Sequence, residues 1–197
     1  MLKEDKSKAF MNTTENKNEG VNKSREAGTN NLLFDFTLDK ATNTVFITRE
    51  FAAELSLVWD AFTLPEILDQ WGAPEPWKTE TISMDFKVGG RRFYKMISPD
   101  GQAYFSVQDF TSISPKTNFK YISGSSDKDA IINPGFYGAE NNLDFSESNG
   151  PDSYPVTTFR MSIKYKDLAT LEMMANDRFR EGITMTLNVL EKLLASR

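Results

Sequence analysis

The segment Arg91–Ile113, RRFYKMISPDGQAYFSVQDFTSI, decides the fold because its pattern has a period of two on both sides of the turn sequence SPDG. Alternation of this kind is typical of strands that bury one face, and Pro-Asp-Gly favours a tight turn. The segment is therefore predicted to form an antiparallel hairpin.

Similar strand patterns lie on both sides of this hairpin, each bounded by turn residues. The predicted strands are Thr44–Phe51, 78–86 (KTETISMDF), 119–123 (FKYIS), 141–148 (NNLDFSES) and 156–165 (VTTFRMSIKY). Residues 124–140, GSSDKDAIINPGFYGAE, are rich in turn-forming and polar residues, and we expect them to be irregular.

Three helices are expected. Apolar residues recur at helical spacing in AAELSLVWDAFT, residues 52–63, and Pro65 opens a second short helix in PEILDQW. A third, long helix is predicted from about Leu168 to Ser196, where a stripe of apolar residues steps by three or four. Gly182 lies inside it, and we expect another backbone to approach closely there.

Strands joined by hairpins, with the helices segregated from them, indicate an α+β fold. A single amphipathic helix laid across a curved antiparallel sheet leaves room for a cavity on the concave side. Residues 32–197 are predicted to form this one domain. Residues 1–31 are polar and charged, and we expect them to form a disordered tail.

Composition excludes several classes of function. The chain of 197 residues has neither cysteine nor histidine, so thiolate nucleophiles, imidazole bases and sites built on these ligands are ruled out. A net charge of −5 argues against nucleic-acid binding. No apolar run is long enough to insert into a membrane, and the N-terminus lacks the apolar core of a signal peptide, so a cytoplasmic location is expected.

Five motifs occur in a characteristic order: VWDAFT followed by a proline, QWGAP, VGGRRFYKM, SPDG, and the last helix LEMMANDRFREGITMTLNVLEKLL. Together they resemble the activator of Hsp90 ATPase homologue 1-like family of the START-like superfamily. The resemblance implies a helix-grip fold, in which about seven antiparallel strands wrap around the C-terminal helix, with two short helices after the first strand and an apolar pocket between sheet and helix. The family's usual pair of tryptophans is reduced to one in QWGAP.

Alternation along the strands and the apolar face of the last helix give the candidate lining of such a pocket. Methionine suits an adaptable wall, and tyrosine, serine, glutamine and arginine would orient a ligand. The candidates are Trp71, Trp77, Arg92, Tyr94, Met96, Tyr104, Ser106, Gln108, Phe110, Phe119, Tyr121, Phe159, Met161, Met174, Glu181 and Met185.

Each candidate also has a structural interpretation. Aromatic and methionine stripes often fill a core without leaving a void, and Trp71 or Trp77 either anchors the second helix or stands at the pocket mouth. Surface placement is the simpler expectation for both Arg91 and Arg92, since a buried arginine needs a carboxylate or an anionic ligand. Trp59 is expected in the core, and Asp109 on the outer face.

Catalytic chemistry would have to use a carboxylate, and Glu181, beside Gly182, is the best single candidate for it. A solvated ion pair on the helix is the simpler explanation of Glu181, so no catalytic residue is assigned. The Gly-Gly before Arg91 lacks the patterns of nucleotide-binding loops, and no metal or cofactor is expected.

The leading hypothesis is a domain that binds a hydrophobic or amphipathic small molecule between sheet and helix. The resemblance suggests a second hypothesis, a co-chaperone that contacts an Hsp90-type ATPase in the stress response. A third is a cyclase or hydrolase that uses carboxylate and tyrosine groups. Pairing of two copies through a sheet edge, to form a homodimer, is compatible with the pattern.

Overall fold

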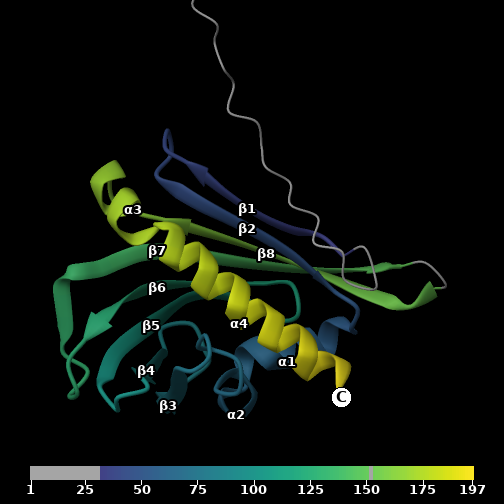
Figure 1. Cartoon of the computed structure of the whole chain (residues 1–197), viewed down its shortest axis with the longest axis horizontal. Coiled ribbons are helices and arrows are strands. Elements are labelled where there is room, and N and C mark those ends of the chain that lie inside the picture. Colours follow the sequence, from purple (N-terminus) through teal and green to yellow (C-terminus); the bar gives the residue numbers. More distant parts are fainter. Residues whose placement is uncertain (1–31, 151–152) are drawn as a thin grey trace, which may run out of the picture.

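The computed structural model describes residues 32–150 and 153–197, which form one curved antiparallel sheet with a long helix across its concave side (Figure 1). The predicted tail, residues 1–31, lies outside the described residues. The strand order is β1-β2-β8-β7-β6-β5-β4-β3. The strands are β1 Phe34–Asp39, β2 Thr44–Phe51, β3 Lys78–Met84, β4 Arg91–Ile97, β5 Ala103–Ser114, β6 Asn118–Ser126, β7 Ile132–Asn149 and β8 Pro155–Lys164. The helices are α1 Leu55–Thr63, α2 Pro65–Leu68, α3 Leu168–Met174 and α4 Asp177–Ala195.

This architecture confirms the α+β prediction and the hairpin over Arg91–Ile113, which is β4 paired with β5. The described sheet has eight strands instead of about seven, and β1 is the strand that the sequence patterns did not assign. The β1–β2 turn is stabilised by the Asp39 carboxylate, which accepts hydrogen bonds from the backbone N–H groups of Ala41 and Thr42.

The prediction of an irregular segment over residues 124–140 is wrong. Strand β6 continues to Ser126 and β7 begins at Ile132, so the two strands form a long hairpin that closes at residues 127–131. The register shifts around Gly124, where β-bulges bend the strands. Backbone pairing with a neighbour therefore overrides the turn-like composition of this segment.

The prediction of one helix from Leu168 to Ser196 is also wrong, because α3 ends at Met174 and α4 begins at Asp177. Asn176 has extended backbone angles, and its side chain accepts a hydrogen bond from the N–H of Phe179. The same side chain donates to the carbonyl of Met173. Asn176 thus ends one helix and caps the next, as short polar side chains do at helix N-termini.

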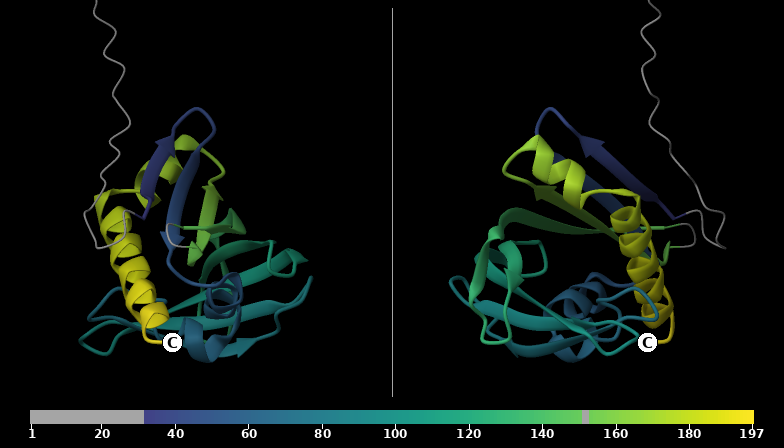
Figure 2. Two further views of the ribbon diagram at one scale, coloured as in Figure 1. Left: turned by 90° about the vertical axis from the view of Figure 1, so that its right-hand side faces the viewer. Right: turned by 60° about the vertical axis from the view of Figure 1, so that its left-hand side comes forward.

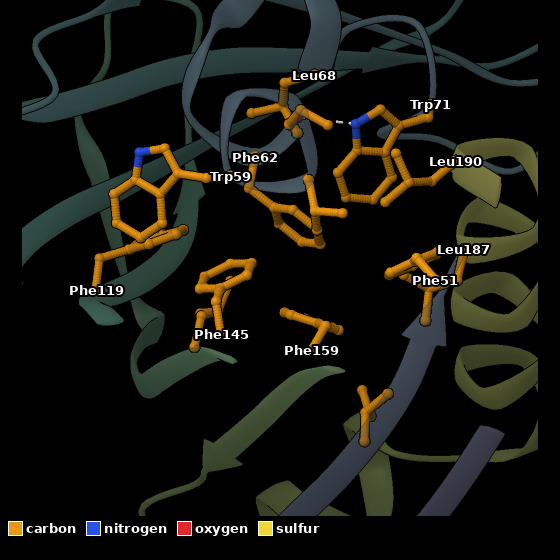
Figure 3. Packing of buried hydrophobic residues seen from close by; sticks show 14 of the residues in the cluster. Phe51, Trp59, Phe62, Leu68, Trp71, Phe119, Phe145, Phe159, Leu187 and Leu190 are labelled. Carbon is orange, nitrogen blue, oxygen red and sulfur yellow. Dashed lines mark hydrogen bonds between the residues drawn. The ribbon is translucent and has the colours of Figure 1, made fainter. Parts of the chain in front are cut away.

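The core lies on the concave face of the sheet, beneath α1 and the C-terminal half of α4, and Figure 3 shows its aromatic part. Trp59, 7% exposed, lies in the core as predicted, and its ring packs edge-on against Phe119 and Phe145 at centroid distances of 5.7 and 5.3 Å. Leu187 and Leu190 are 1% and 0% exposed and bring α4 onto this cluster. The core therefore fixes α1, α4 and the central strands to one another.

A smaller cluster covers the outer face of the sheet. Tyr137 on β7 lies over Gly124 of β6, and its hydroxyl donates to Asp109 at 2.8 Å. Asp109 also accepts from Arg91, which confirms the outer-face placement of this carboxylate. Beneath them Val107 is completely buried. An aromatic ring laid over a strand glycine protects the exposed backbone there.

Gly124→Ala is expected to lower the free energy of unfolding by about 1–3 kcal/mol, because the added methyl overpacks a well-filled site. A Cβ at this position would lie 2.7 Å from the Cα and ring of Tyr137 and 2.8 Å from the Phe136 carbonyl oxygen. Urea denaturation measures the change. Gly135→Ala, in the same hairpin, is the matched control, since its Cβ would meet nothing closer than 3.4 Å. Equal stability of the two variants would contradict the packing argument.

Gly182→Ala is expected to raise the free energy of unfolding by about 0.5–1 kcal/mol, since alanine is the better helix former. The expected close approach of a backbone is not found, because the nearest atom to a Cβ here is the side-chain Cγ of Pro74, at 3.9 Å. That is ordinary van der Waals contact, so the methyl fits without displacement. Thermal and urea unfolding measure the change, and a loss of stability would show that the glycine is needed.

Candidate functional site

The inner face of β4, β5 and β6 carries a patch of polar and half-apolar side chains, here called the inner patch. Strand register places Arg92 opposite Gln108, Tyr94 opposite Ser106, and Met96 opposite Tyr104. Residues directly opposite in an antiparallel pair share a face, and Gln108 shares its face with the core residue Phe110. The inner patch therefore faces the same side of the sheet as the core and α4.

Helix α4 does not cover this patch. Its N-terminal half leans on β1, where the rings of Phe179 and Phe36 are 6.1 Å apart, and its buried residues begin only at Thr186. Figure 2 shows the sheet curving around α4, with the start of the helix beside β1 and β2. Tyr94, Met96, Ser106 and Gln108 are consequently only half-buried although they face the inside of the fold.

Arg92 is the buried cation of the inner patch, with a side chain that is 4% exposed. Its Nε donates to Thr81 Oγ1 at 2.9 Å, and its Nη2 donates to Asp69 Oδ1 at 3.1 Å. The guanidinium lies over the ring of Tyr94, 4.2 Å from the centroid. The expectation of surface placement is wrong for Arg92, because Asp69, directly after α2, supplies the carboxylate that a buried arginine needs.

Burial lowers the pKa of Arg92, while Tyr94 and Asp69 raise it. An arginine side chain nevertheless stays protonated in proteins, so the site holds a full positive charge. Asp69 balances this charge. Both of its oxygens already accept hydrogen bonds, from Arg92 and from the hydroxyl and N–H of Thr81. The carboxylate is thus engaged in holding α2 against β3 and β4.

Two buried tyrosines add neutral hydroxyls to the region. Burial raises the pKa of Tyr121, and the nearby Tyr94 raises it further, whereas Arg92 lowers it. Burial also raises the pKa of Tyr165 to about 12. Both groups therefore stay protonated at neutral pH. Within the described parts of the chain, neither hydroxyl forms a hydrogen bond to another protein group, so each can donate one to a ligand.

A groove of about 470 Å³ opens beside this region, between the loop that follows α2 and helix α4. Trp77 and Thr79 border it on the sheet side, and Val189 borders it on the helix side. Asp69 lines the groove as well as pairing with Arg92. The ring of Tyr104 lies 5.5 Å from that of Trp77, so an aromatic pair stands next to the groove.

The two candidate tryptophans have different positions. Trp71 is 6% exposed, packs against Phe62 and donates from its indole Nε1 to the Ala61 carbonyl at 2.9 Å, the dashed line in Figure 3. It belongs to the core cluster. Trp77 is half-buried and lines the groove. The two tryptophans are thus divided between the core and the groove.

The remaining candidates fall into three groups. Phe110, Phe119, Phe159 and Tyr121 belong to the core cluster, and Met161 packs against it. Arg92, Tyr94, Met96, Ser106 and Gln108 form the inner patch, with Tyr104, 49% exposed, at its edge. Met174 and Met185 are 42% and 44% exposed, and Glu181 is also exposed, so these three lie away from the core face of their helices.

Sequence reasoning missed Asp69, Thr79, Asn141, Tyr165 and Val189. Asn141, 5% exposed, donates from Nδ2 to Ser123 Oγ at 2.9 Å on the same inner face. Alternation from Phe145 through Leu143 would have placed Asn141 there, and alternation from Ile163 would have placed Tyr165. No comparable signal marks Asp69 or Val189, since their role depends on how the helices pack.

The described residues contain no cluster of three or more potential metal-binding side chains. None of the helices within 32–150 and 153–197 is long and apolar enough to cross a membrane.

Solved bacterial structures share this fold. A crystal structure of a protein from Mycobacterium smegmatis matches with a TM-score of 0.72 and 26% identity, covering 82% of this chain and 97% of the other. A solution structure from Arthrobacter aurescens matches with a TM-score of 0.73 and 20% identity, over 83% and 92% of the two chains. One from Staphylococcus epidermidis has a TM-score of 0.71 and 23% identity, over 81% and 94%.

No curated protein matches the chain. The family model described as activator of Hsp90 ATPase homolog 1-like protein matches residues 52–195, from the residue after β2 to the last residue of α4. The match agrees with the helix-grip architecture and with the ordered motifs of the sequence. The chain therefore belongs to the activator of Hsp90 ATPase homologue 1-like family.

Proposed function

We propose that this protein binds a small molecule with an apolar body in the space between the inner patch and helix α4. The observation that carries the proposal is the half-buried state of Tyr94, Met96, Ser106 and Gln108, which face the interior without being covered by the helix. These inner-patch side chains would become fully buried only if another molecule filled the space between the patch and α4. A small molecule is the simplest filling, since pockets of this kind are concave and partly preformed.

The chemistry of the surrounding side chains supports an amphipathic ligand. Trp77, Met96 and Val189 offer apolar contact, and burial of apolar surface stabilises a complex by about 25 cal/mol per Å². Tyr121 and Arg92 offer hydrogen bonds at the deeper end. A few convergent polar groups within apolar walls fix the orientation of a ligand while the walls supply affinity.

The same geometry favours binding over acid–base catalysis. Asp69, the carboxylate next to Arg92, already accepts three hydrogen bonds and pairs with a cation, so both of its oxygens are engaged in structural contacts. Glu181, the carboxylate singled out in the sequence, is exposed on α4. We therefore assign the inner patch to recognition of a ligand.

The neutral dye Nile red is expected to bind the protein with an increase and blue shift of its fluorescence. Ser106→Trp is expected to weaken this binding by about tenfold or more, because an indole in the centre of the inner patch occupies the space of the ligand. Titration of the dye at fixed protein concentration measures both affinities.

The matched control is Lys120→Trp, which adds the same indole at an exposed position of β6, next to the inner-face residues Phe119 and Tyr121 but alternating to the other face. The control should bind the dye like the unmodified protein. Equal affinity of the Ser106 variant and the control, with both variants folded by circular dichroism, would contradict a ligand site on the inner patch.

A further inference from the structure

Hydrogen-bond donors with unused capacity gather around Arg92. Its guanidinium has five N–H donors, and Thr81 and Asp69 account for two of them. Across the described residues, no hydrogen bond leaves its Nη1 atom or the hydroxyls of Tyr94 and Tyr121. Tyr94 stacks under the guanidinium, and Tyr121, on the same inner face, is close enough to Arg92 for that cation to lower its pKa. These groups are therefore available as donors to a ligand oxygen on the inner face of the sheet.

The charge of the site is already balanced inside the protein. Asp69 lies 3.1 Å from the guanidinium and neutralises it. The groove adds one further acidic residue, Glu75, and one basic residue, Lys78. Arg92, Asp69, Glu75 and Lys78 therefore sum to zero. A site built to capture an anion would instead show an excess of positive charge.

A second anion at Arg92 would be unfavourable for a physical reason. A carboxylate that accepts from Arg92 would lie close to Asp69, and two like charges near a side chain that is only 4% exposed are poorly screened by water. The desolvation of the incoming carboxylate adds to this penalty. A neutral carbonyl or hydroxyl oxygen can accept hydrogen bonds from the same donors, and it avoids both the repulsion from Asp69 and the desolvation cost of a carboxylate.

We infer that the ligand is an uncharged, mainly apolar molecule that presents a carbonyl or hydroxyl oxygen, and not a carboxylate or phosphate, to Arg92, Tyr94 and Tyr121. This inference rests on the proposed function and names the ligand class for that site. The apolar body of the ligand extends from these donors over Met96 towards Trp77.

Three probes with the same chain length and different head groups test the inference: 2-decanone, decan-1-ol and decanoate. Isothermal titration calorimetry at pH 7.5, where decanoate is ionised, gives their affinities. The two neutral probes are expected to bind about tenfold or more tightly than decanoate, since the anion meets the field of Asp69.

Tyr121→Phe keeps the ring and removes the hydroxyl, so it is expected to weaken 2-decanone binding by about fivefold, the effect of one hydrogen bond. Tyr137→Phe removes a hydroxyl from the outer face of the sheet, where Asp109 accepts it, and is the matched control. The control is expected to bind all three probes as the unmodified protein does.

Asp69→Asn removes the balancing charge and keeps an oxygen that can accept from Arg92. It is expected to reverse the preference, so that decanoate binds more tightly than 2-decanone. If this variant does not fold, two other measurements test the inference: the comparison of the three probes on the unmodified protein, and the affinity of the Tyr121→Phe variant.

Decanoate binding as tightly as the neutral probes would overturn the inference and leave the proposed ligand site intact. An unchanged affinity of Tyr121→Phe for 2-decanone would also overturn it, because the donor set would then not touch the ligand. Failure of all three probes to bind would instead contradict the proposed function, and the inference with it.

Discussion

A single long helix has to cover the concave face of an eight-stranded sheet, and the arrangement of the core and of the inner patch follows from this constraint. Helix α4 has 19 residues and is therefore about 28 Å long and about 10 Å wide. Eight strands at their usual spacing span about 34 Å. The helix can cover only a strip of such a surface.

Helix α4 lies along β1 and β2, where Phe179 meets Phe36, and over the aromatic core, where Leu187 and Leu190 are buried. Helix α1 closes the core end through Trp59, and the inner patch on β4 to β6 is the part left half-exposed.

The parts of the fold that depend on local pattern could be predicted from the sequence. Alternation over Arg91–Ile113 gave the central hairpin, and the same period in Phe34, Phe36 and Leu38 was present but not used for β1. The β6–β7 hairpin could not be predicted, because its pairing is supported by Tyr137 lying over Gly124, a contact that no periodic pattern in this polar, turn-rich segment marks. The break at Asn176 was hidden because the apolar stripe continues through it, while the cap depends on side-chain hydrogen bonds.

The candidate site could likewise be predicted from the sequence only in part. Strand alternation put Arg92 on the same face as Tyr94 and Met96, since a side chain's face follows from its position in the strand, but it did not predict that Arg92 is buried. The partner of Arg92 could not be predicted, because Asp69 lies 23 residues away on a different element. The sequence predicts a wide apolar stripe on the last helix, which includes Met185. In the structure the buried residues of α4 form a narrow stripe, and Met185 is 44% exposed.

The pair of Arg92 and Asp69 is difficult to explain as a source of stability alone. Buried ion pairs lose hydration, and well-packed apolar residues of similar volume often give equal or greater stability. The core of this protein is built from such residues on the same face of the sheet, around Phe119 and Phe145. An arginine at this position does provide what an apolar side chain cannot: a guanidinium that is held in place by Asp69 and Thr81 and whose Nη1 forms no hydrogen bond within the described residues. Fixed donors of this kind need no reorganisation when a ligand arrives, which lowers the entropy loss of binding. In the proposed site, the ion pair therefore makes physical sense as preorganisation, with Asp69 setting the charge that the proposed ligand must not carry.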